Sequence, residues 1–112
     1  MKHIIIRWDD LLENDHWDTK TTPIFDCENF NIAKIRKTWD DIKLGYDTDS
    51  DVAYYVLDWE GKCVIEWKEY SIKKWDLLFY PKWTAYKHLK WLTLLAISNP
   101  QFDRKKRVYL EK

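Results

Sequence analysis

The acids and lysines between residues 51 and 68 have the types and order that metal-dependent hydrolysis uses. Asp51 lies upstream of Glu66, and Lys68 follows Glu66 after one intervening residue. Two carboxylates of this kind bind Mg²⁺, and a lysine beside them assists the attacking water. The pattern is unspecific, because an acid two residues before a lysine also occurs at positions 18, 41, 60 and 103. We therefore assign no catalytic residue and rank a nuclease third among three possible functions.

The same three residues resemble the carboxylate, carboxylate and lysine set of the PD-(D/E)xK nucleases. The resemblance covers roughly half of the chain, since the elements expected there follow the order helix, strand, strand, helix, strand. It implies a Mg²⁺-dependent nuclease in which Asp51 and Glu66 bind the metal and Lys68 assists the water. The sequence lacks the proline that precedes the aspartate in that family, and the expected hairpin places Asp51 and Glu66 on opposite faces of the sheet.

A second acidic pattern lies in the segment YDTDSD. Asp47, Asp49 and Asp51 have the spacing of the first three ligands of a helix-loop-helix calcium site, and Asp58 occupies the twelfth position. Val52 replaces the glycine required at the sixth position, and an aspartate replaces the bidentate glutamate. We therefore expect no metal here and interpret the segment as an acidic loop.

The remaining reactive residues form no recognisable site. His3, His16 and His88 are dispersed, without a nearby serine or cysteine that would form a nucleophile pair. Cys27 and Cys63 lack metal-binding spacing and are too few for a disulfide framework, which favours a reducing compartment. With two glycines the chain has no glycine-rich phosphate loop, so we expect no cofactor. No stretch approaches the roughly 20 apolar residues that cross a bilayer, and we expect a cytoplasmic protein without a membrane partner.

The zero net charge conceals a division between the two halves of the chain. Residues 1–58 hold seven Lys/Arg and thirteen Asp/Glu, whereas residues 59–112 hold twelve and six. Such asymmetry indicates either a charged partner or attraction between the halves within the fold. Our leading hypothesis is a small non-enzymatic inhibitor, of the toxin-immunity or counter-defence type, which occludes the basic surface of a protein partner such as a nuclease toxin. The expected acidic, aromatic-rich face carries Asp9, Asp10, Asp15, Asp47, Asp49 and Asp51.

The alternative is single-stranded nucleic-acid binding through the basic second half. Exposed tryptophans stack on bases, while lysine and arginine side chains contact phosphates. The candidate residues lie on an expected helix and in the basic cluster that follows it: Trp83, Lys87, Lys90, Trp91, Arg104, Lys105, Lys106 and Arg107.

The elements that must position these residues predict an α+β fold. Residues 29–44 and 81–97 place their apolar side chains at helical spacing, the first helix ending at Gly45 and the second beginning at Pro81. Residues 3–8, 75–80 and 108–110 predict strands, and residues 52–59 and 63–70 predict a hairpin that turns at Gly61. We expect one domain over residues 1–112, with a mainly antiparallel sheet and two principal helices packed on one face. The helical stripes are Ile32, Ile35, Trp39 and Ile42, and Ala85, Leu89, Leu92 and Ala96.

Tryptophan recurs every eight residues at positions 59, 67, 75, 83 and 91. Eight residues preserve the face of a strand but rotate by about 80° on a helix, and repeat architectures usually have units of about 20 to 50 residues. We therefore interpret the spacing as coincidental. In this interpretation Cys63 and Trp67, which lie on one face of a strand, belong to the sheet core, and Trp83 and Trp91 remain for contact with a partner.

Overall fold

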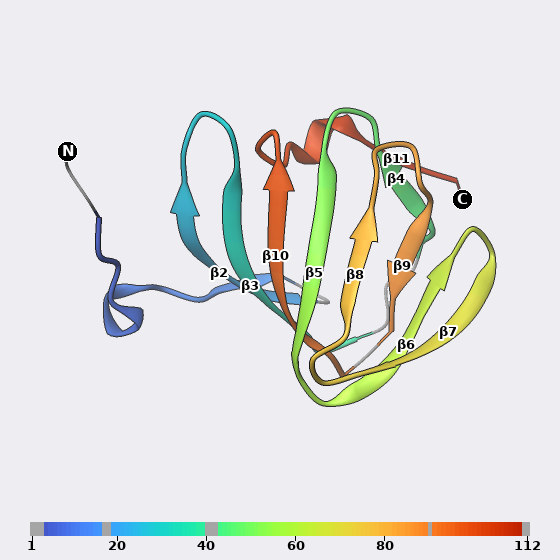
Figure 1. Cartoon of the computed structure of the whole chain (residues 1–112), viewed down its shortest axis with the longest axis horizontal. Coiled ribbons are helices and arrows are strands. Elements are labelled where there is room, and N and C mark those ends of the chain that lie inside the picture. Colours follow the sequence, from blue (N-terminus) through green and yellow to red (C-terminus); the bar gives the residue numbers. More distant parts are fainter. Residues whose placement is uncertain (1–3, 17–18, 40–42, 90, 111–112) are drawn as a thin grey trace.

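The chain folds into two antiparallel β-sheets that pack face to face. The computed structural model describes residues 4–16, 19–39, 43–89 and 91–110. The first sheet has the strand order β1-β2-β3-β10-β5-β8, and the second has the order β11-β4-β9-β6-β7 (Figure 1). The strands of the first sheet are β1 (Asn14–His16), β2 (Thr19–Asp26), β3 (Asn31–Lys37), β10 (Thr93–Asn99), β5 (Asp51–Asp58) and β8 (Leu77–Tyr80). Those of the second are β11 (Arg107–Tyr109), β4 (Gly45–Asp47), β9 (Tyr86–His88), β6 (Glu60–Ile65) and β7 (Lys68–Lys73).

The predicted α+β fold with two principal helices is wrong. Within the described residues the helical elements are two short 3₁₀ turns, η1 (Trp8–Asp10) and η2 (Arg104–Lys106). The predicted strand at 3–8 is also wrong, because residues 4–7 have no regular structure and η1 follows them; residue 3 lies outside the described residues. The strands predicted at 75–80 and 108–110 correspond in part to β8 and β11.

The segment predicted as the first helix forms strand β3. Ile32 pairs with Ile97 and Ile35 pairs with Leu94 on β10, so the two isoleucines, three residues apart, point to opposite faces of the sheet. Their helical spacing therefore has no structural meaning here. Trp39 is exposed rather than in the core, and Asp41 and Ile42 lie outside the described residues.

The segment predicted as the second helix contributes β9 and β10. Leu92, Leu94 and Ala96 are all buried, and they follow the period of two that is typical of a strand. β-branched and aromatic residues favour this conformation, and the segment contains Thr93, Ile97 and Tyr86. Gly45, predicted to end a helix, has no left-handed backbone and lies within β4.

The predicted hairpin joins the wrong strands. β5 and β6 belong to different sheets, and β6 pairs instead with β7. The turn of this hairpin is formed by Glu66 and Trp67, which both have positive φ (49° and 71°), as the central residues of a type I′ turn require. Gly61 lies inside β6, opposite Ile72. Trp67 is consequently exposed at a turn, and its predicted place in the sheet core is wrong.

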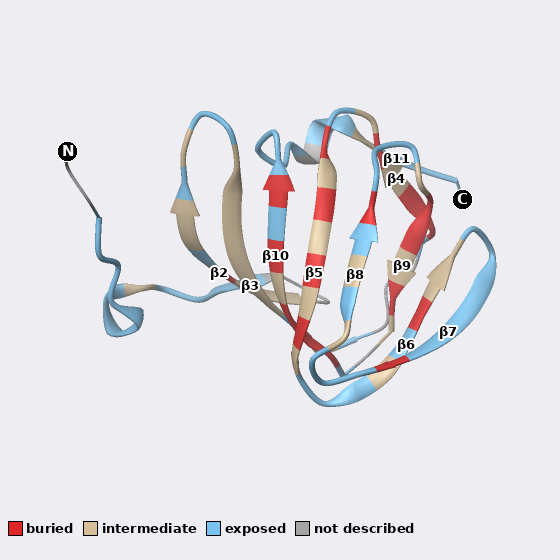
Figure 2. Cartoon of the chain, viewed as in Figure 1, coloured by how far each residue is buried: buried red, intermediate tan, exposed pale blue. Residues whose placement is uncertain are grey.

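The space between the sheets is filled by alternate residues of the facing strands, which Figure 2 shows as alternating colours along β5 and β10. Val52, Tyr54 and Val56 point inward from β5, and the second sheet contributes Cys63 and Ile72. The inward orientation predicted for Cys63 is confirmed by its full burial. This interior is unusual in containing several polar side chains among the apolar ones.

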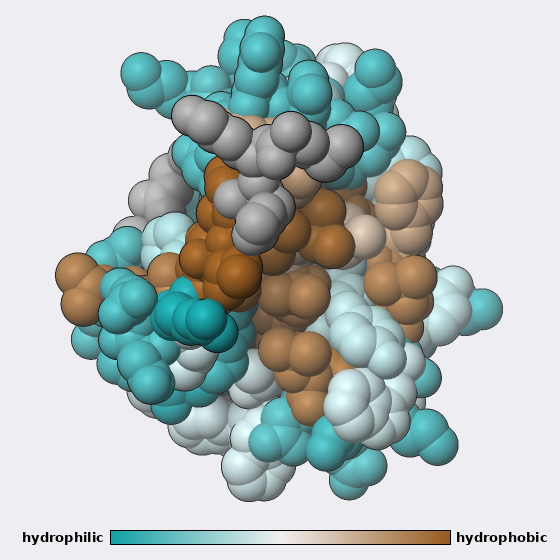
Figure 3. Space-filling model, turned by 60° about the vertical axis from the view of Figure 1, so that its left-hand side comes forward, coloured by the Kyte–Doolittle hydropathy of each residue, from teal (hydrophilic) through white to brown (hydrophobic). Residues whose placement is uncertain are grey.

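The N-terminal segment lies at the β1–β2 side of the molecule, where Figure 3 shows hydrophobic side chains gathered on the surface. Ile4, Ile5 and Ile6 are exposed, and the Lys34 ammonium lies 4.8 Å from the centre of the Trp8 ring. Within the described part of the chain no helix has the length and apolar character needed to span a membrane.

Candidate functional site

Four aromatic rings meet between the two sheets. Tyr54 and Tyr80 come from the first sheet, and Tyr86 and His88 come from the second. The rings of Tyr80 and Tyr86 stack with centroids 3.9 Å apart, and the ring of Tyr54 meets His88 edge-on at 4.6 Å. None of the four residues is more than 9% exposed. The rings therefore form one packed cluster, with four polar groups enclosed in the interior.

Strand alternation explains why these rings meet. Tyr86 and His88 are two residues apart on β9, so both point to the same face of the second sheet. Tyr80 pairs with the buried Val52, and Tyr54 pairs with Leu78, so Tyr54 and Tyr80 project from the inner face of the first sheet. Since facing sheets lie about 10 Å apart, side chains of this size reach one another across the interior.

The imidazole of His88 is hydrogen bonded to a phenol. The Tyr80 hydroxyl lies 3.0 Å from His88 Nε2, and the tautomer of the ring decides which atom donates. Cys63 pairs with His88 across β6 and β9, and its thiol is hydrogen bonded to Tyr80. Burial raises the pKa of the Cys63 thiol, and the contact with Tyr80 offsets part of that rise. Cys63 is thus a neutral thiol beside the Tyr80–His88 pair.

A second chain of hydrogen bonds runs from Tyr54 to Asp47. The Tyr86 hydroxyl donates to Asp47 Oδ2 at 3.2 Å, and the Tyr54 and Tyr86 hydroxyl oxygens lie 2.9 Å apart. Because the single hydroxyl proton of Tyr86 is directed at the carboxylate, Tyr54 donates to Tyr86. Burial is the largest cause of a strongly raised pKa at Tyr86, and the neighbouring Tyr54 adds to it. Tyr86 is therefore a neutral phenol.

Arg107 closes this chain at the β11 side of the second sheet. Its guanidinium contacts both Asp47 oxygens at 3.3 Å and donates to the backbone oxygens of Gly45 and Tyr86 at 3.3 and 3.2 Å. It also lies over the rings of Tyr86 and Tyr109, at 4.5 and 5.6 Å from their centres. Burial alone lowers the pKa of Arg107, but Tyr86 and Asp47 outweigh it and raise the pKa above its ordinary range. The guanidinium is thus a permanent cation with several of its donors used within the fold.

Gly45 allows β11 to approach β4 this closely. A Cβ atom at position 45 would lie 2.8 Å from the backbone oxygen of Val108 and 3.4 Å from Arg107 Nε. Any side chain would therefore displace β11 together with Arg107. The glycine keeps the arginine beside Asp47.

The arrangement is suited to proton transfer rather than to metal binding. Histidine is the side chain whose ordinary pKa lies near neutral pH, and a hydrogen-bonded phenol fixes its orientation. Within residues 4–16, 19–39, 43–89 and 91–110, no three His, Cys, Asp or Glu side chains form a group that could hold a metal ion. Asp47 is committed to Arg107 and Tyr86, and His88 Nε2 to Tyr80.

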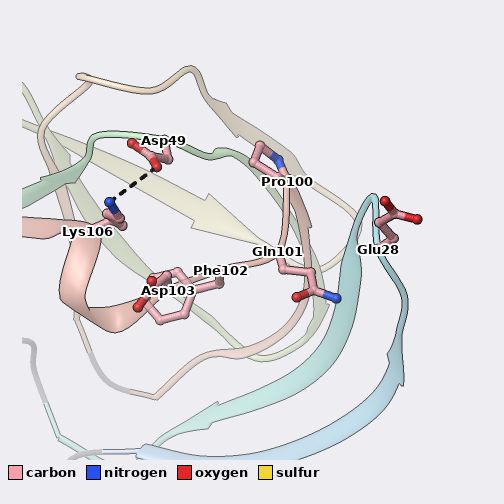
Figure 4. A pocket seen from close by; sticks show the side chains of 7 residues that line it. All are labelled: Glu28, Asp49, Pro100, Gln101, Phe102, Asp103 and Lys106. Carbon is pink, nitrogen blue, oxygen red and sulfur yellow. Dashed lines mark ion pairs between the residues drawn. The ribbon is translucent and has the colours of Figure 1, made fainter.

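A separate pocket of about 450 Å³ lies where the β10–η2 connection meets the β4–β5 loop (Figure 4). Lys106 Nζ lies 3.9 Å from Asp49 Oδ2, and Asp103 Oδ1 accepts the backbone N–H of Lys105. The Gln101 side chain donates to the backbone oxygen of Cys27. These contacts tie the connections together, and the described residues that line the pocket include no histidine and no cysteine. Its lining residues are Glu28, Asp49, Pro100, Gln101, Phe102, Asp103 and Lys106.

The structure separates the residues of the predicted acidic face. Asp9 and Asp10 lie in η1, in the N-terminal segment, and Asp15 lies on the edge strand β1. The other three lie around the β4–β5 loop, which Figure 1 places on the far side of the molecule from that segment. Asp47 is buried against Arg107, which is a correction to its predicted surface role. Asp49 is exposed, and Asp51 Oδ1 accepts the backbone N–H of Lys82 at 2.8 Å.

The predicted nucleic-acid residues are not brought together either. Trp83 lies between β8 and β9, and Trp91 lies between β9 and β10, so they occupy opposite ends of the molecule instead of one helix. Lys87 is half-buried on β9, and Lys90 lies outside the described residues. Of the basic cluster, Arg107 is largely buried and Lys106 pairs with Asp49. Arg104 and Lys105 lie in η2.

The nuclease-like set is also dispersed between two sheets. Asp51 begins β5, whereas Glu66 and Lys68 lie at the β6–β7 turn. Glu66 Oε1 accepts the backbone N–H of Ala85 at 3.3 Å, and Lys68 lies 5.4 Å from the Tyr70 ring. These contacts are structural, and no metal-binding group forms among the described residues.

The sequence does not predict the four residues of the ring cluster as site residues, and it places Asp47 and Arg107 on the surface. His88 was noted only as dispersed, because sequence distance does not show which strands face each other. One local signal was present: Tyr86 and His88, two apart in YKH, are both positioned for one face of a strand. The helix prediction over residues 81–97 concealed that signal.

Comparison with known proteins decides the fold. No protein-family model matches the chain, and no curated protein matches it significantly. Among solved structures, the nucleoside dehydratase Pac13 from Streptomyces, in a tyrosine variant with uridine, superposes with a TM-score of 0.86 over 99% of this chain and 93% of that chain, at 11% identity. An RmlC-like cupin from Shewanella frigidimarina superposes with a TM-score of 0.75 over 93% and 95% of the two chains, at 12% identity. The chain has a cupin-like fold.

KdgF from Halomonas sp. has the same cupin-like architecture, with a TM-score of 0.79 over 93% of this chain and 99% of that chain, at 9% identity. At these identities the likeness is one of fold alone. The inhibitor hypothesis is nevertheless overturned, because the similar structures are cupin-like β-barrel proteins that include a nucleoside dehydratase, KdgF and an RmlC-like cupin. The nucleic-acid and nuclease alternatives also lose their basis, since both required the helices that the cupin-like fold lacks in its described residues.

Proposed function

We propose that this cupin-like protein is an enzyme that transfers protons on a small hydroxylated organic molecule. The observation that carries the proposal is the buried contact between the Tyr80 hydroxyl and His88 Nε2 at 3.0 Å. Enclosing polar groups costs stability unless each is hydrogen bonded, and perturbed titratable groups cluster at functional sites. The similar structure of a nucleoside dehydratase supports a role in chemistry rather than in packing alone.

Dehydration is the reaction class that fits these groups best. It removes a proton from the carbon beside a carbonyl and gives a proton to the departing hydroxyl, so it needs one base and one acid. In our proposal His88 accepts the proton from carbon, and the resulting imidazolium gives that proton to the departing hydroxyl, which leaves as water. Tyr80 holds the imidazole in one orientation. Tyr86 and Tyr54 are neutral phenols within the same cluster and orient the polar groups of the ligand. Asp47 and Arg107 act as positioning residues, because they fix Tyr86 through a hydrogen bond and a cation–ring contact.

The packing of the interior restricts the ligand to a small molecule. Tyr80 and Tyr86 stack at 3.9 Å, so a ligand that reaches His88 has to displace one of these rings. Side-chain rearrangements of this kind limit the rate of association but not the chemistry. A polymer could not enter, because all four rings are buried.

The test is a comparison of the native protein with the His88→Gln variant. Glutamine retains hydrogen-bonding capacity toward Tyr80 but cannot take up a proton. Both proteins are incubated with uridine and with a panel of small β-hydroxy aldehydes and ketones, and loss of water is followed by mass spectrometry. Glu69→Gln, an exposed change on β7, serves as the control.

We expect the native protein and the control to dehydrate at least one compound, and His88→Gln to be about 100-fold slower or worse. Conversion by His88→Gln at the native rate would exclude His88 as the proton acceptor. If the native protein neither binds nor converts any of the compounds, the dehydratase proposal is wrong.

A further inference from the structure

The eight-residue tryptophan spacing has a structural cause. Each of the five tryptophans follows one strand and precedes the next, in the connections from β5 through β10. One strand and the connection after it together take seven to nine residues, and successive connections alternate between the two ends of the molecule (Figure 1). Trp59, Trp75 and Trp91 therefore lie at one end, and Trp67 and Trp83 lie at the other. The recurrence of tryptophan thus follows the succession of strands and connections, and no repeat domain underlies it.

A fourth tryptophan joins the first group. Trp39 follows β3, which is antiparallel to β10 and so ends where β10 begins. The strands adjoining Trp39, Trp91, Trp59 and Trp75 are β3, β10, β5 and β8, which are consecutive neighbours in the first sheet. Since neighbouring strands lie about 4.8 Å apart, the four strand ends form a row about 14 Å long. We call these four residues the tryptophan row.

The tryptophan row is well exposed. Trp39, Trp59, Trp75 and Trp91 are 55%, 64%, 61% and 56% exposed, although tryptophan is on average a highly buried residue. Trp59 and Trp75 also have left-handed backbones, with φ of 69° and 77°, which is a strained conformation for a bulky side chain. Four large aromatic side chains are thus accessible to solvent along neighbouring strand ends.

The charges around the row are mixed. Asp58 and Glu60 flank Trp59, whereas Lys73, Lys74 and Asp76 surround Trp75. Three acidic residues and two lysines thus surround Trp59 and Trp75. The ammonium group of one of these lysines, Lys74, lies 4.8 Å from the Trp75 ring centre. A polyanion such as single-stranded nucleic acid needs a surplus of positive charge along its path, and the described residues beside Trp59 and Trp75 provide none. The interleaved charges also break the continuous apolar patch that a hydrophobic protein partner requires.

We propose that the tryptophan row binds a neutral oligosaccharide. One face of a sugar ring presents C–H groups, whose partial positive charge is attracted to the negative face of an indole. The hydroxyl groups at the ring edges can donate to carboxylates, and Asp58 and Asp76 each use one oxygen in a backbone contact and keep further acceptor sites. A row of separated, flat aromatic side chains matches a chain of consecutive sugar rings better than a single compact ligand. This surface is independent of the proposed reaction at His88.

The test compares two tryptophans that have the same exposed fraction and backbone conformation but lie at different ends of the molecule. Trp59 and Trp67 are both 64% exposed and have φ of 69° and 71°, but they lie at opposite ends. Native protein, Trp59→Ala and Trp67→Ala are titrated with linear hexasaccharides of glucose, mannose and N-acetylglucosamine, and binding is measured by calorimetry and tryptophan fluorescence. An oligothymidylate and anionic phospholipid vesicles are titrated in parallel.

We expect one hexasaccharide to bind, Trp59→Ala to weaken it about tenfold or more, and Trp67→Ala to leave it unchanged. The proposal is overturned if no hexasaccharide binds, if Trp67→Ala weakens binding equally, or if only the oligonucleotide or the vesicles bind. His88→Gln should bind the sugar normally, so failure of the reaction at His88 and failure of this surface are distinguishable.

Discussion

The carboxylate of Asp47 and the guanidinium of Arg107 form an ion pair inside the molecule, 3.3 Å apart and joining residues from the two oppositely charged halves of the sequence. Lys106 and Asp49 form a second, exposed pair across the same halves. Attraction between the halves within the fold therefore explains part of the charge division. The buried pair also fixes Tyr86, and through it the inner cluster of rings.

Replacing Asp47 should test how far the fold depends on this pair. We expect Asp47→Asn to lower the free energy of unfolding by about 3 kcal/mol, because it leaves the buried Arg107 cation uncompensated. Asp49→Asn is the matched control, and we expect it to cost less than about 1 kcal/mol since that pair is exposed. Urea denaturation measures both. If both variants lower the free energy of unfolding equally, the buried ion pair stabilises the fold no more than the exposed pair does.

The direction of the Tyr54–Tyr86–Asp47 chain gives a second prediction. Tyr86→Phe removes two hydrogen bonds, whereas Tyr54→Phe removes the one between the two phenols. We expect losses in unfolding free energy of about 2 kcal/mol and about 1 kcal/mol, respectively. Both variants keep the aromatic ring, so packing is conserved. A larger loss for Tyr54→Phe would contradict the assigned direction.

Replacing Trp67 in the β6–β7 turn by glycine should stabilise the protein. Trp67 has φ of 71° and is exposed, so Trp67→Gly relieves backbone strain without emptying the core. We expect unfolding free energy to rise by about 1 kcal/mol. Leu77→Gly, at an exposed strand position without positive φ, should instead destabilise the protein by about 0.5 to 1 kcal/mol. If both changes destabilise it, strain at Trp67 is negligible.

Alkaline pH should destabilise the protein in two steps. Cys63 and Tyr86 have raised pKa values in the folded state, against ordinary values of 9.0 and 10.0. Above those pH values the unfolded chain releases protons that the folded protein keeps, so stability is full below pH 9 and falls above it. Cys63→Ala should remove the decline that begins near pH 9, and Tyr86→Phe the one that begins near pH 10. Stability curves measured from pH 7 to 11 would be parallel for all three proteins if neither group is responsible.

Several strands were predictable from local pattern, but their pairing was not. The alternation around Cys63 correctly placed that thiol inside, because the period of two depends only on the strand itself. Gly61 is predicted as the turn residue, yet Glu66 and Trp67 form the turn. Positive φ is unfavourable for both residue types, and contacts of Glu66 with a distant segment stabilise the turn. Glu66 donates its N–H to Ala85 and accepts the N–H of Ala85 through its side chain, and both bonds are long-range.

The candidate site was hidden for the same reason. Tyr54, Tyr80 and His88 lie on three strands from two sheets, and only the tertiary arrangement brings them together. The two helices were predicted because isoleucines and leucines happened to fall three or four residues apart. In β3 that spacing places Ile32 and Ile35 on opposite faces, which the sequence pattern could not distinguish from one helical stripe.

The most direct measurement of the proposed reaction is the uptake of solvent deuterium by the substrate. A compound from the hydroxy-carbonyl panel that the native protein converts is incubated in D₂O, and exchange at the carbon beside the carbonyl is followed by proton NMR. We expect exchange with the native protein, and we expect His88→Gln to lower the exchange rate by about 100-fold or more. Equal exchange with both proteins would contradict a role for His88 in moving the proton.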